Sequence, residues 1–330
     1  MNLIGNSHIH AQINVAIKSA TQRNRSIPHI LFSGASGCGK TSTSRKLAYD
    51  TEADFLSVLP DSLKTSDDVW HLMERLNYDS YNEVGDRTGP VKPSIVFIDE
   101  IHNLSVKTQE MLGVAMENFY LESDNRGKLI WLPYFTVVGA TTNDGILTKP
   151  FRDRFKLRFL FKPYPVNESK DILSEHCKRL GIYIDDAARE SIARRGRGIP
   201  RILVGYLERA RDRMLYEDEE RITFDMAEQT FKSLNIDNEG FTEAEIKIMK
   251  VLFGSKTAIG VENLSVISGE APKTITNSVE PYLIQKGFIL RTGKGRIITE
   301  EGKKYLMANG HLDGRITPVR KEISVTYQRK

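Results

Sequence analysis

The chain has 330 residues, 40% of them hydrophobic and 27% charged, which is enough for at least one buried core and for two or three domains. Its longest apolar runs, SIVFI and FTVVGA, are too short to span a bilayer, and the N-terminus lacks the basic-then-apolar layout of a signal peptide. The two cysteines, Cys38 and Cys177, argue against a disulfide framework or a cysteine metal site. We therefore expect a soluble, cytoplasmic protein that makes no membrane contact.

The formal net charge of +4 is modest, but the positive residues cluster. Eight arginines lie between Arg189 and Arg213, and the tail from Arg315 to Lys330 holds five basic residues against Glu322 alone. Local basic density of this kind suits phosphate groups, either of a nucleotide or of a nucleic acid backbone. A solvated surface is the alternative, and charge alone leaves the choice open.

The first half of the chain alternates helical and strand-like segments. Residues 3–22 are predicted as a helix, because Ile9, Ile13, Ala16 and Ile17 recur on one face. Short apolar strands are predicted at HILFSG (29–34), SIVFIDE (94–100) and FTVVGATTN (135–143), with a helix-compatible stretch directly after the first strand and its glycine loop. Apolar strands separated by helices predict a parallel sheet with helices on both faces, hence an α/β fold.

From Pro163 onward only helices are predicted, which indicates a small helical lid domain. Asn167 is expected to cap a helix that ends near Leu180 before Gly181, and Asp185 to cap the next. A third helix is expected over 199–217. The polar segment 235–240 then marks a boundary.

The last part of the chain reads as a winged helix-turn-helix domain. Three short helices are expected over 242–253, 262–268 and 272–287, followed by strand-like FILRT and RIITE around a Gly-Lys-Gly turn. The predicted organisation is therefore a large α/β sheet domain at 1–162, a helical lid at 163–236 and a winged-helix domain with a basic tail at 237–330.

The segment SGASGCGKTS, residues 33–42, contains the pattern G-x-x-x-x-G-K-T between a strand and a helix. Its glycines allow backbone N–H groups to close around phosphate oxygens, while Lys40 reaches the β and γ phosphates and the Thr41 hydroxyl coordinates Mg²⁺. A fortuitous glycine-rich turn is the alternative. The predicted nucleotide-binding positions here are Gly34, Gly37, Cys38, Gly39, Lys40, Thr41 and Ser42.

Two acids end the second strand, about sixty residues further on. Asp99 is expected to hold Mg²⁺ through water and Glu100 to polarise the attacking water. Paired acids at a strand end are often only solvated, but together with the glycine loop they favour ATP hydrolysis over storage.

The stretch GATTNDGILTKPFRDRF adds a polar strand tip and two arginines. Thr142 can hydrogen-bond near the γ phosphate or the lytic water. Arg152 and Arg154 follow a proline turn, where an arginine serves the nucleotide of a neighbouring subunit and so predicts a ring; a plain salt bridge is the alternative for one of them. Arg201, directly after Pro200 in the lid, can touch the γ phosphate, with a structural ion pair as the alternative.

Together these motifs resemble the RuvB family of AAA+ ATPases, the motor subunits of bacterial Holliday-junction processing. The matching segments run in the family's order from about Ile4 to Ile298: GASGCGKT, IVFIDEIHNL, FTVVGATTNDGILTKPFRDRF, RRGRGIPRI and VEPYLIQKGFILRTGKGR. The last belongs to the family's winged helix and discriminates best. By this resemblance Lys40 and Thr41 form the first phosphate motif, Asp99 and Glu100 the second, Thr142 is the first sensor, Arg154 the trans arginine, and Arg201, with Pro200, the second sensor.

The resemblance implies a homohexameric ring that uses ATP and Mg²⁺ to drive double-stranded DNA through four-way junctions, beside a RuvA-type junction-binding protein and a RuvC-type resolvase. This chain departs from the family in four places: in its loop, which has Ala35, Ser36 and Cys38; at Asn143, where the family has an arginine; in the longer segment 78–94; and in the shorter segment 118–133, where the RuvA-binding hairpin lies. An adenine pocket is expected around Leu3, Ile4 and Pro28.

DNA contact is assigned to the winged helix, with Lys273, Arg291, Lys294 and Arg296 as candidates because the third helix and wing of such domains approach phosphates. A protein-interaction module is the alternative. For the whole chain, the alternatives to a junction motor are a clamp-loader-like or initiator-like ATP switch that loads another protein on DNA, and a DNA-binding ring without enzyme activity. The presence of Lys40, Glu100 and Arg154 argues against the last.

Overall fold

The computed structural model describes residues 4–77, 93–122 and 129–312. Leu3, most of the long segment 78–94 and the basic tail lie outside the described residues. The chain divides into two compact units, Met1–Phe224 and Asp225–Lys330, and each is described by itself. The finer division into three domains stays a prediction.

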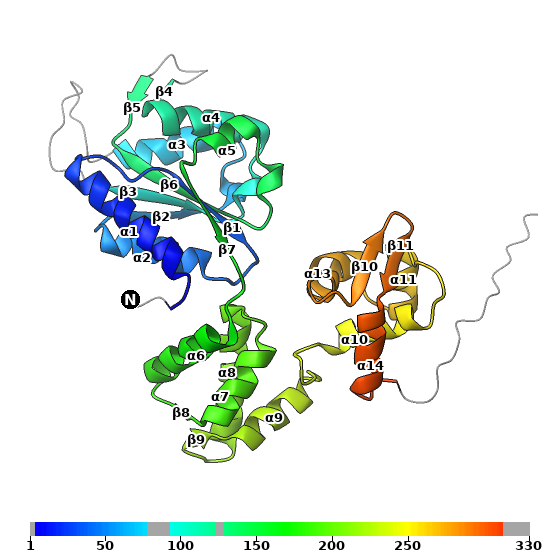
Figure 1. The fold of residues 1–330 in the computed structure, drawn as a ribbon. Helices are drawn as coiled ribbons and strands as arrows, with labels where there is room; N and C mark the ends of the chain where they lie inside the picture. Colours follow the sequence, from blue (N-terminus) through cyan, green and yellow to red (C-terminus); the bar gives the residue numbers. More distant parts are fainter. Residues whose placement is uncertain (1–3, 78–92, 123–128, 313–330) are drawn as a thin grey trace, which may run out of the picture. The chain divides into compact units, whose positions relative to one another are not determined.

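The first unit contains a five-stranded parallel sheet in the order β2-β3-β6-β1-β7 (Figure 1). The predicted α/β fold is therefore confirmed, and two strands, β2 and β7, join the three expected ones. The strands are β1 (Ile30–Gly34), β2 (Asp54–Val58), β3 (Ser94–Ile98), β6 (Phe135–Thr141) and β7 (Leu157–Phe161).

Helices cover both faces of the sheet (Figure 1). On one face, Ile30, Phe32 and Phe97 pack against α1 (Ser7–Gln22) and α2 (Lys40–Asp50). On the other face, Leu31, Val96 and Val137 pack against the remaining helices. Because both faces are buried, the inner strands β1, β3 and β6 read as largely continuous apolar runs rather than alternating ones. The helices of the second face are α3 (Ser66–Asn77), α4 (Val106–Asn118) and α5 (Lys149–Asp153), and the short 3-10 turns are Pro60–Ser62, Ile101–Asn103 and Asp144–Ile146.

The helical part that follows contains α6 (Val166–Leu180), α7 (Asp186–Arg195) and α8 (Pro200–Tyr216). Gly181 ends α6 at φ 66°, as predicted. The expected cap at Asn167 is wrong, because α6 begins earlier, at Val166, with Pro165 in the N-cap position. The expectation of helices alone is also wrong, since β8 (Tyr183–Ile184) pairs in parallel with β9 (Arg221–Ile222).

The second unit contains the winged helix-turn-helix. Its first helix, α10, carries a capping box in which Thr242 and Glu245 satisfy each other's main-chain N–H groups. The core is formed by apolar residues of the helices and hairpin, including Phe241, Leu264 and Ile289. The elements are α9 (Phe224–Ser233, whose first residue belongs to the first unit), α10 (Glu243–Phe253), α11 (Val261–Ser268), α12 (Pro272–Thr274), a π-helical turn (Ile275–Val279), α13 (Glu280–Gln285), β10 (Ile289–Thr292), β11 (Gly295–Ile298) and α14 (Glu300–Ala308).

Candidate nucleotide site and nucleic-acid interface

The glycine loop lies between β1 and α2 and needs glycine for steric reasons. Gly34, Gly37 and Gly39 have φ angles of 137°, 82° and 94°, in the region that disfavours side chains. A Cβ on Gly34 would come 2.4 Å from the Phe161 carbonyl oxygen. The loop therefore folds tightly over the end of the sheet and leads directly into the first turn of α2.

Lys40 is the first residue of α2 and is only 6% exposed. Its Nζ donates to the carbonyls of Gly34 at 2.7 Å and Ala35 at 3.0 Å. Burial lowers the pKa of Lys40, while the nearby charges of Glu100 and Asp99 act in the opposite direction. The ammonium group is thus held inside the loop, at the start of a helix whose N-terminus favours anions.

The two acids and the predicted sensor meet at the ends of neighbouring strands. Thr142 follows β6 and donates from both its N–H (3.3 Å) and its hydroxyl (3.1 Å) to Oε2 of Glu100, which lies beyond the end of β3. Asp99 Oδ1 accepts from the main-chain N–H of Glu100 at 3.1 Å. Residues 42 positions apart are brought together because carboxyl ends of parallel strands share one edge of the sheet.

His102 belongs to the same cluster and was not singled out from the sequence. Its Nδ1 lies 3.2 Å from Glu100 Oε2 and 2.9 Å from the hydroxyl of buried Thr141. The hydrogen bond of Nδ1 is to the Thr141 hydroxyl, and either group can be its donor. A histidine in an I-D-E-I-H segment carries no spacing signal for this contact, so only the fold shows it.

A cavity of about 560 Å³ joins the glycine loop, the strand ends and the lid. Arg201 lines it from α8, and its Nη1 donates to the Ser36 hydroxyl at 3.0 Å. Gly34 and Cys38 support the loop from behind, the first as acceptor for Lys40 and the second as acceptor for the Tyr164 hydroxyl at 3.3 Å. The predicted residues that line the cavity are Gly37, Gly39, Lys40, Thr41, Ser42, Asp99, Glu100, Pro200 and Arg201.

A second cavity, of about 410 Å³, adjoins the first and shares Gly39, Ser42, His176 and Pro200 with it. Ile4 lines it, as expected of an adenine pocket, whereas Pro28 does not. Its other walls come from α1, α2 and the lid, which the sequence did not predict. The remaining lining residues are His10, Thr43, Tyr164, Ile172, Glu175 and Arg179.

Arg154 lies outside both cavities, directly after α5. Its Nε donates to the Gly113 carbonyl and its Nη1 to the Pro150 carbonyl, each at 2.8 Å, and its Nη2 lies 3.0 Å from Glu117 Oε2. It therefore does not reach the nucleotide cavity of its own chain. This placement is compatible with the predicted role toward a neighbouring copy.

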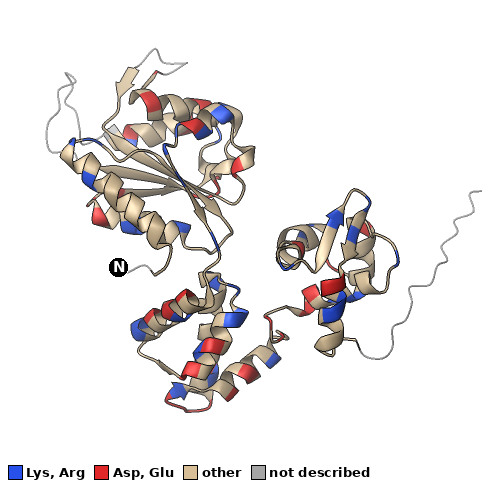
Figure 2. Ribbon diagram, in the orientation of Figure 1, with Lys and Arg blue, Asp and Glu red and all other residues tan. Residues whose placement is uncertain are grey.

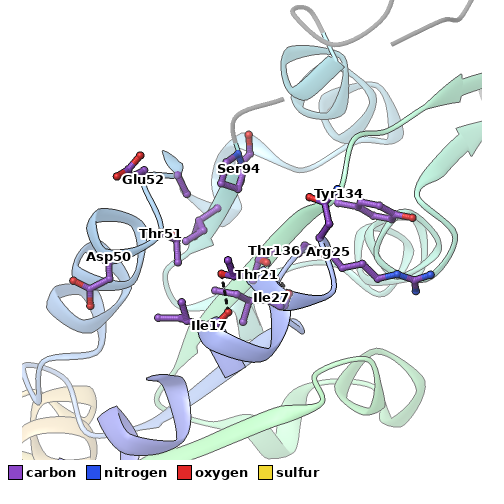
Figure 3. Close-up of a pocket in the computed structure, with 16 residues that line it drawn as sticks. Ile17, Thr21, Arg25, Ile27, Asp50, Thr51, Glu52, Ser94, Tyr134 and Thr136 are labelled. Carbon is purple, nitrogen blue, oxygen red and sulfur yellow. Dashed lines mark hydrogen bonds between the residues drawn. The ribbon is translucent and has the colours of Figure 1, made fainter. Parts of the chain in front are cut away.

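A third cavity, of about 370 Å³, lies at the amino-terminal ends of the strands, opposite the glycine loop (Figure 3). The Thr21, Thr51 and Thr136 hydroxyls donate to the main-chain carbonyls of Ile17, Leu47 and Ile27. Its threonine hydroxyls are thus used within the fold. The predicted nucleotide-binding residues all lie elsewhere, so this cavity is not the candidate site.

Three of the four basic residues that were predicted to contact DNA are exposed in the winged-helix unit. Lys273, Arg291 and Lys294 are exposed, and basic residues mark both strands of the hairpin (Figure 2). Arg296 is different: it is only 6% exposed and its guanidinium forms a buried ion pair with both carboxylate oxygens of Glu280. Because these donors are used within the fold, the geometry gives no support to a phosphate contact by Arg296.

The described part of the chain contains no helix that is long and apolar enough to cross a membrane. Parallel strands, a phosphate loop after β1, two acids after β3 and an arginine from a helical lid define a nucleotide-binding P-loop protein of the AAA type, here followed by a winged helix. Models of three RuvB domains match in that order: the P-loop domain of the Holliday junction DNA helicase RuvB over 1–160, the RuvB AAA lid over 164–237 and the RuvB C-terminal winged helix over 238–307.

Similar proteins agree with these matches. Holliday junction branch migration complex subunits RuvB of Campylobacter fetus and Fervidobacterium nodosum are 35% and 33% identical, over 90% and 93% of this chain and 84% and 86% of theirs. The structure of the Thermotoga maritima RuvB Holliday junction branch migration motor superposes with a TM-score of 0.77 at 31% identity, over 92% of this chain and 95% of that one. The chain belongs to the RuvB family.

Proposed function

We propose that this protein is the ATP-driven motor of Holliday junction branch migration, which moves double-stranded DNA through a homohexameric ring. The observation that carries the proposal is the cavity in which the glycine loop, Asp99, Glu100 and lid residue Arg201 meet, in a chain that also bears a winged helix. The names of its relatives supply the junction as the substrate.

The residues of the cavity divide the work of phosphoryl transfer. Lys40 binds the β and γ phosphates, Glu100 orients and polarises the attacking water, and Thr142 holds Glu100 through two hydrogen bonds. Arg201 connects the lid to the glycine loop through its hydrogen bond to Ser36, so loss of the γ phosphate changes the contacts that hold the lid and allows it to move. Arg154 serves the nucleotide of the next copy in the ring.

The donor set of the cavity fits Mg²⁺. The Thr41 hydroxyl and the Asp99 carboxylate are hard oxygen ligands, and both line the cavity beside Lys40. These two residues would hold the ion, directly or through water, and its charge would neutralise phosphate oxygens. The adjoining cavity, with Ile4 and Tyr164 in its walls, takes the adenine.

Partners follow from the family and from exposed elements. The hairpin of β4 (Tyr120–Glu122) and β5 (Leu129–Trp131) exposes Leu129 and Trp131 by 47% and 58%, which suits contact with a RuvA-type protein. Lys273, Arg291 and Lys294 contact DNA phosphates. A RuvC-type resolvase is a further partner, and the site of action is the cytoplasm.

The test is ATP-driven dissociation of a synthetic four-way DNA junction, with and without a RuvA-type protein. We expect arms to separate only with ATP and a divalent cation, and Glu100→Gln to bind ATP yet leave junctions intact. Dependence on the partner would show that the short hairpin still docks. DNA-stimulated hydrolysis with intact junctions under both conditions would instead favour a loader-type ATP switch.

A further inference from the structure

Arg154 is anchored at all three of its side-chain nitrogens. The carbonyls of Gly113 in α4 and Pro150 in α5 accept from Nε and Nη1, and Nη2 forms an ion pair with Glu117 of α4. The two contacts from α4 lie four residues apart, which places them one helical turn apart on the same face. The side chain of Arg154 is 24% exposed and that of Glu117 is 63% exposed.

Gly113 makes this close approach possible. It lies in the interior of α4, where glycine is less favourable than alanine. A Cβ at this position would come within 3.0 Å of Arg154 Nε and 3.1 Å of its Cδ and Cζ, and these are the nearest atoms that it would meet. The absence of a side chain at Gly113 therefore lets the Arg154 guanidinium lie directly against α4.

The remaining donors of Arg154 define what it offers to a ligand. A guanidinium carries five N–H groups in a fixed plane; here two of them donate to carbonyls, and Nη2 lies 3.0 Å from Glu117 Oε2. Each terminal nitrogen therefore keeps at least one N–H that makes no hydrogen bond among the described residues. Two donors on a rigid planar group match two oxygens of a phosphoryl group.

We propose that Gly113 and Glu117 are positioning residues that orient the Arg154 guanidinium toward the γ phosphate bound by the next copy of this chain. This inference rests on the proposed trans role of Arg154. An exposed ion pair contributes little stability, so the role of Glu117 is to orient the Arg154 guanidinium rather than to stabilise the fold. A misdirected arginine lowers the rate of phosphoryl transfer without weakening nucleotide binding.

The first test compares Glu117→Ala and Gly113→Ala with Glu110→Ala, which removes an exposed carboxylate of the same helix that has no hydrogen bond or ion pair with Arg154 among the described residues. We expect kcat for ATP hydrolysis to fall by about fivefold or more in the first two variants, with an unchanged nucleotide Kd, and no change in Glu110→Ala. Gly113→Ala should keep or raise Tm, because alanine favours the helix. A fall in Tm that accounts for the lost activity would overturn the inference.

The second test mixes variants, since a residue that acts on the neighbouring site can be supplied by a neighbour. Lys40→Ala subunits lack nucleotide binding but carry an intact Arg154. We expect Lys40→Ala to restore hydrolysis when mixed with Arg154→Ala, Glu117→Ala or Gly113→Ala. Full activity of Arg154→Ala, or its failure to be rescued, would overturn the trans role itself. Two outcomes would overturn only the positioning role, provided that Arg154→Ala is rescued. In the first, Glu117→Ala and Gly113→Ala hydrolyse ATP at the wild-type rate; in the second, they stay inactive when mixed with Lys40→Ala.

Discussion

Glu100 combines a strained main chain with a side chain held by its neighbours. Its main chain adopts φ 46° and ψ 46°, a left-handed conformation that costs a non-glycine residue roughly 1 kcal/mol or more. Thr142 donates two hydrogen bonds to the Glu100 carboxylate, and His102 lies beside it. These contacts offset the cost of the main-chain conformation and hold the carboxylate in the wall of the cavity.

This geometry predicts different outcomes for two amide substitutions of His102. The amide nitrogen of asparagine can occupy the place of Nδ1, whereas that of glutamine lies nearer to Nε2. We therefore expect His102→Asn to keep most of the turnover, and His102→Gln and His102→Leu to lose about tenfold in kcat, because the Nδ1 contacts with Thr141 and Glu100 are lost. Steady-state hydrolysis and nucleotide Kd measure both effects.

The Kd for ATP should change little in all three His102 variants, since the histidine does not line the described phosphate cavity. Wild-type kcat in His102→Leu, or a higher kcat in His102→Gln than in His102→Asn, would contradict a role for the Nδ1 contacts.

At the scale of elements, His29 links a strand to a helix. The residue precedes β1 and is 7% exposed; its Nδ1 accepts from the Val137 N–H of β6, and its Nε2 lies 2.9 Å from the Met116 carbonyl of α4. Burial lowers its pKa to about 4. Because the folded pKa is below the ordinary value of 6.5, this contribution to stability is fully present above pH 6.5 and is lost as the pH falls toward 4.

We predict that the first unit loses about 2 kcal/mol of unfolding free energy through His29 between pH 7 and pH 5. Both tryptophans, Trp70 and Trp131, belong to this unit, so urea unfolding followed by their fluorescence reports on it selectively. His29→Gln retains a donor and an acceptor but does not titrate. The variant should show a smaller loss than the parent protein, and equal losses in both would contradict the assignment.

The sequence predicted those elements in which a local signal and the tertiary fold agree. The glycine loop, the apolar strands β1, β3 and β6 and the end of α6 at Gly181 all follow from backbone or burial requirements that act on neighbouring residues. β7 has the pattern LRFLF, in which alternate residues are exposed, so it lacks the continuous apolar run of a central strand. The start of α6 is set by Pro165 rather than by the better-capping Asn167 two residues later.

The candidate site was predictable where a motif fixes the residue type, and not where long-range contacts choose the partner. Lys40, Asp99 and Glu100 stand at strand and helix ends that the topology brings together. No sequence motif marks His102 or Tyr164, and only the fold brings them into contact with the site. For Arg296 the local pattern gave the wrong prediction. A basic residue on the wing was expected to face DNA, but its guanidinium is buried in an ion pair with Glu280 of α13.

At the scale of the whole molecule, ATP hydrolysis and DNA contact are assigned to different units. The nucleotide cavity is formed entirely within Met1–Phe224, whereas Lys294 and Arg291 belong to the unit that begins at Asp225. Substitutions in the wing should therefore act on DNA affinity without altering the chemistry of the nucleotide site. Arg296 is unsuited to this test, since its loss would leave Glu280 buried without its partner, at a cost of about 3–5 kcal/mol.

The corresponding prediction concerns Arg291→Gln combined with Lys294→Gln. Each phosphate contact contributes roughly one unit to the slope of log affinity against log salt, so the double variant should lose about two units of slope on duplex DNA. A matched control, Lys250→Gln with Lys304→Gln, removes the same charge from exposed positions of α10 and α14 and should keep the slope.

Hydrolysis without DNA should be unchanged in both double variants, while stimulation by DNA should require higher DNA concentrations only in the wing variant. Measuring the two activities on one preparation separates the roles of the units. If the wing variant kept the parental salt slope, the winged helix would have to contact DNA through another face or act as a protein-interaction module. If its hydrolysis without DNA fell as well, the separation of roles between the two units would be wrong.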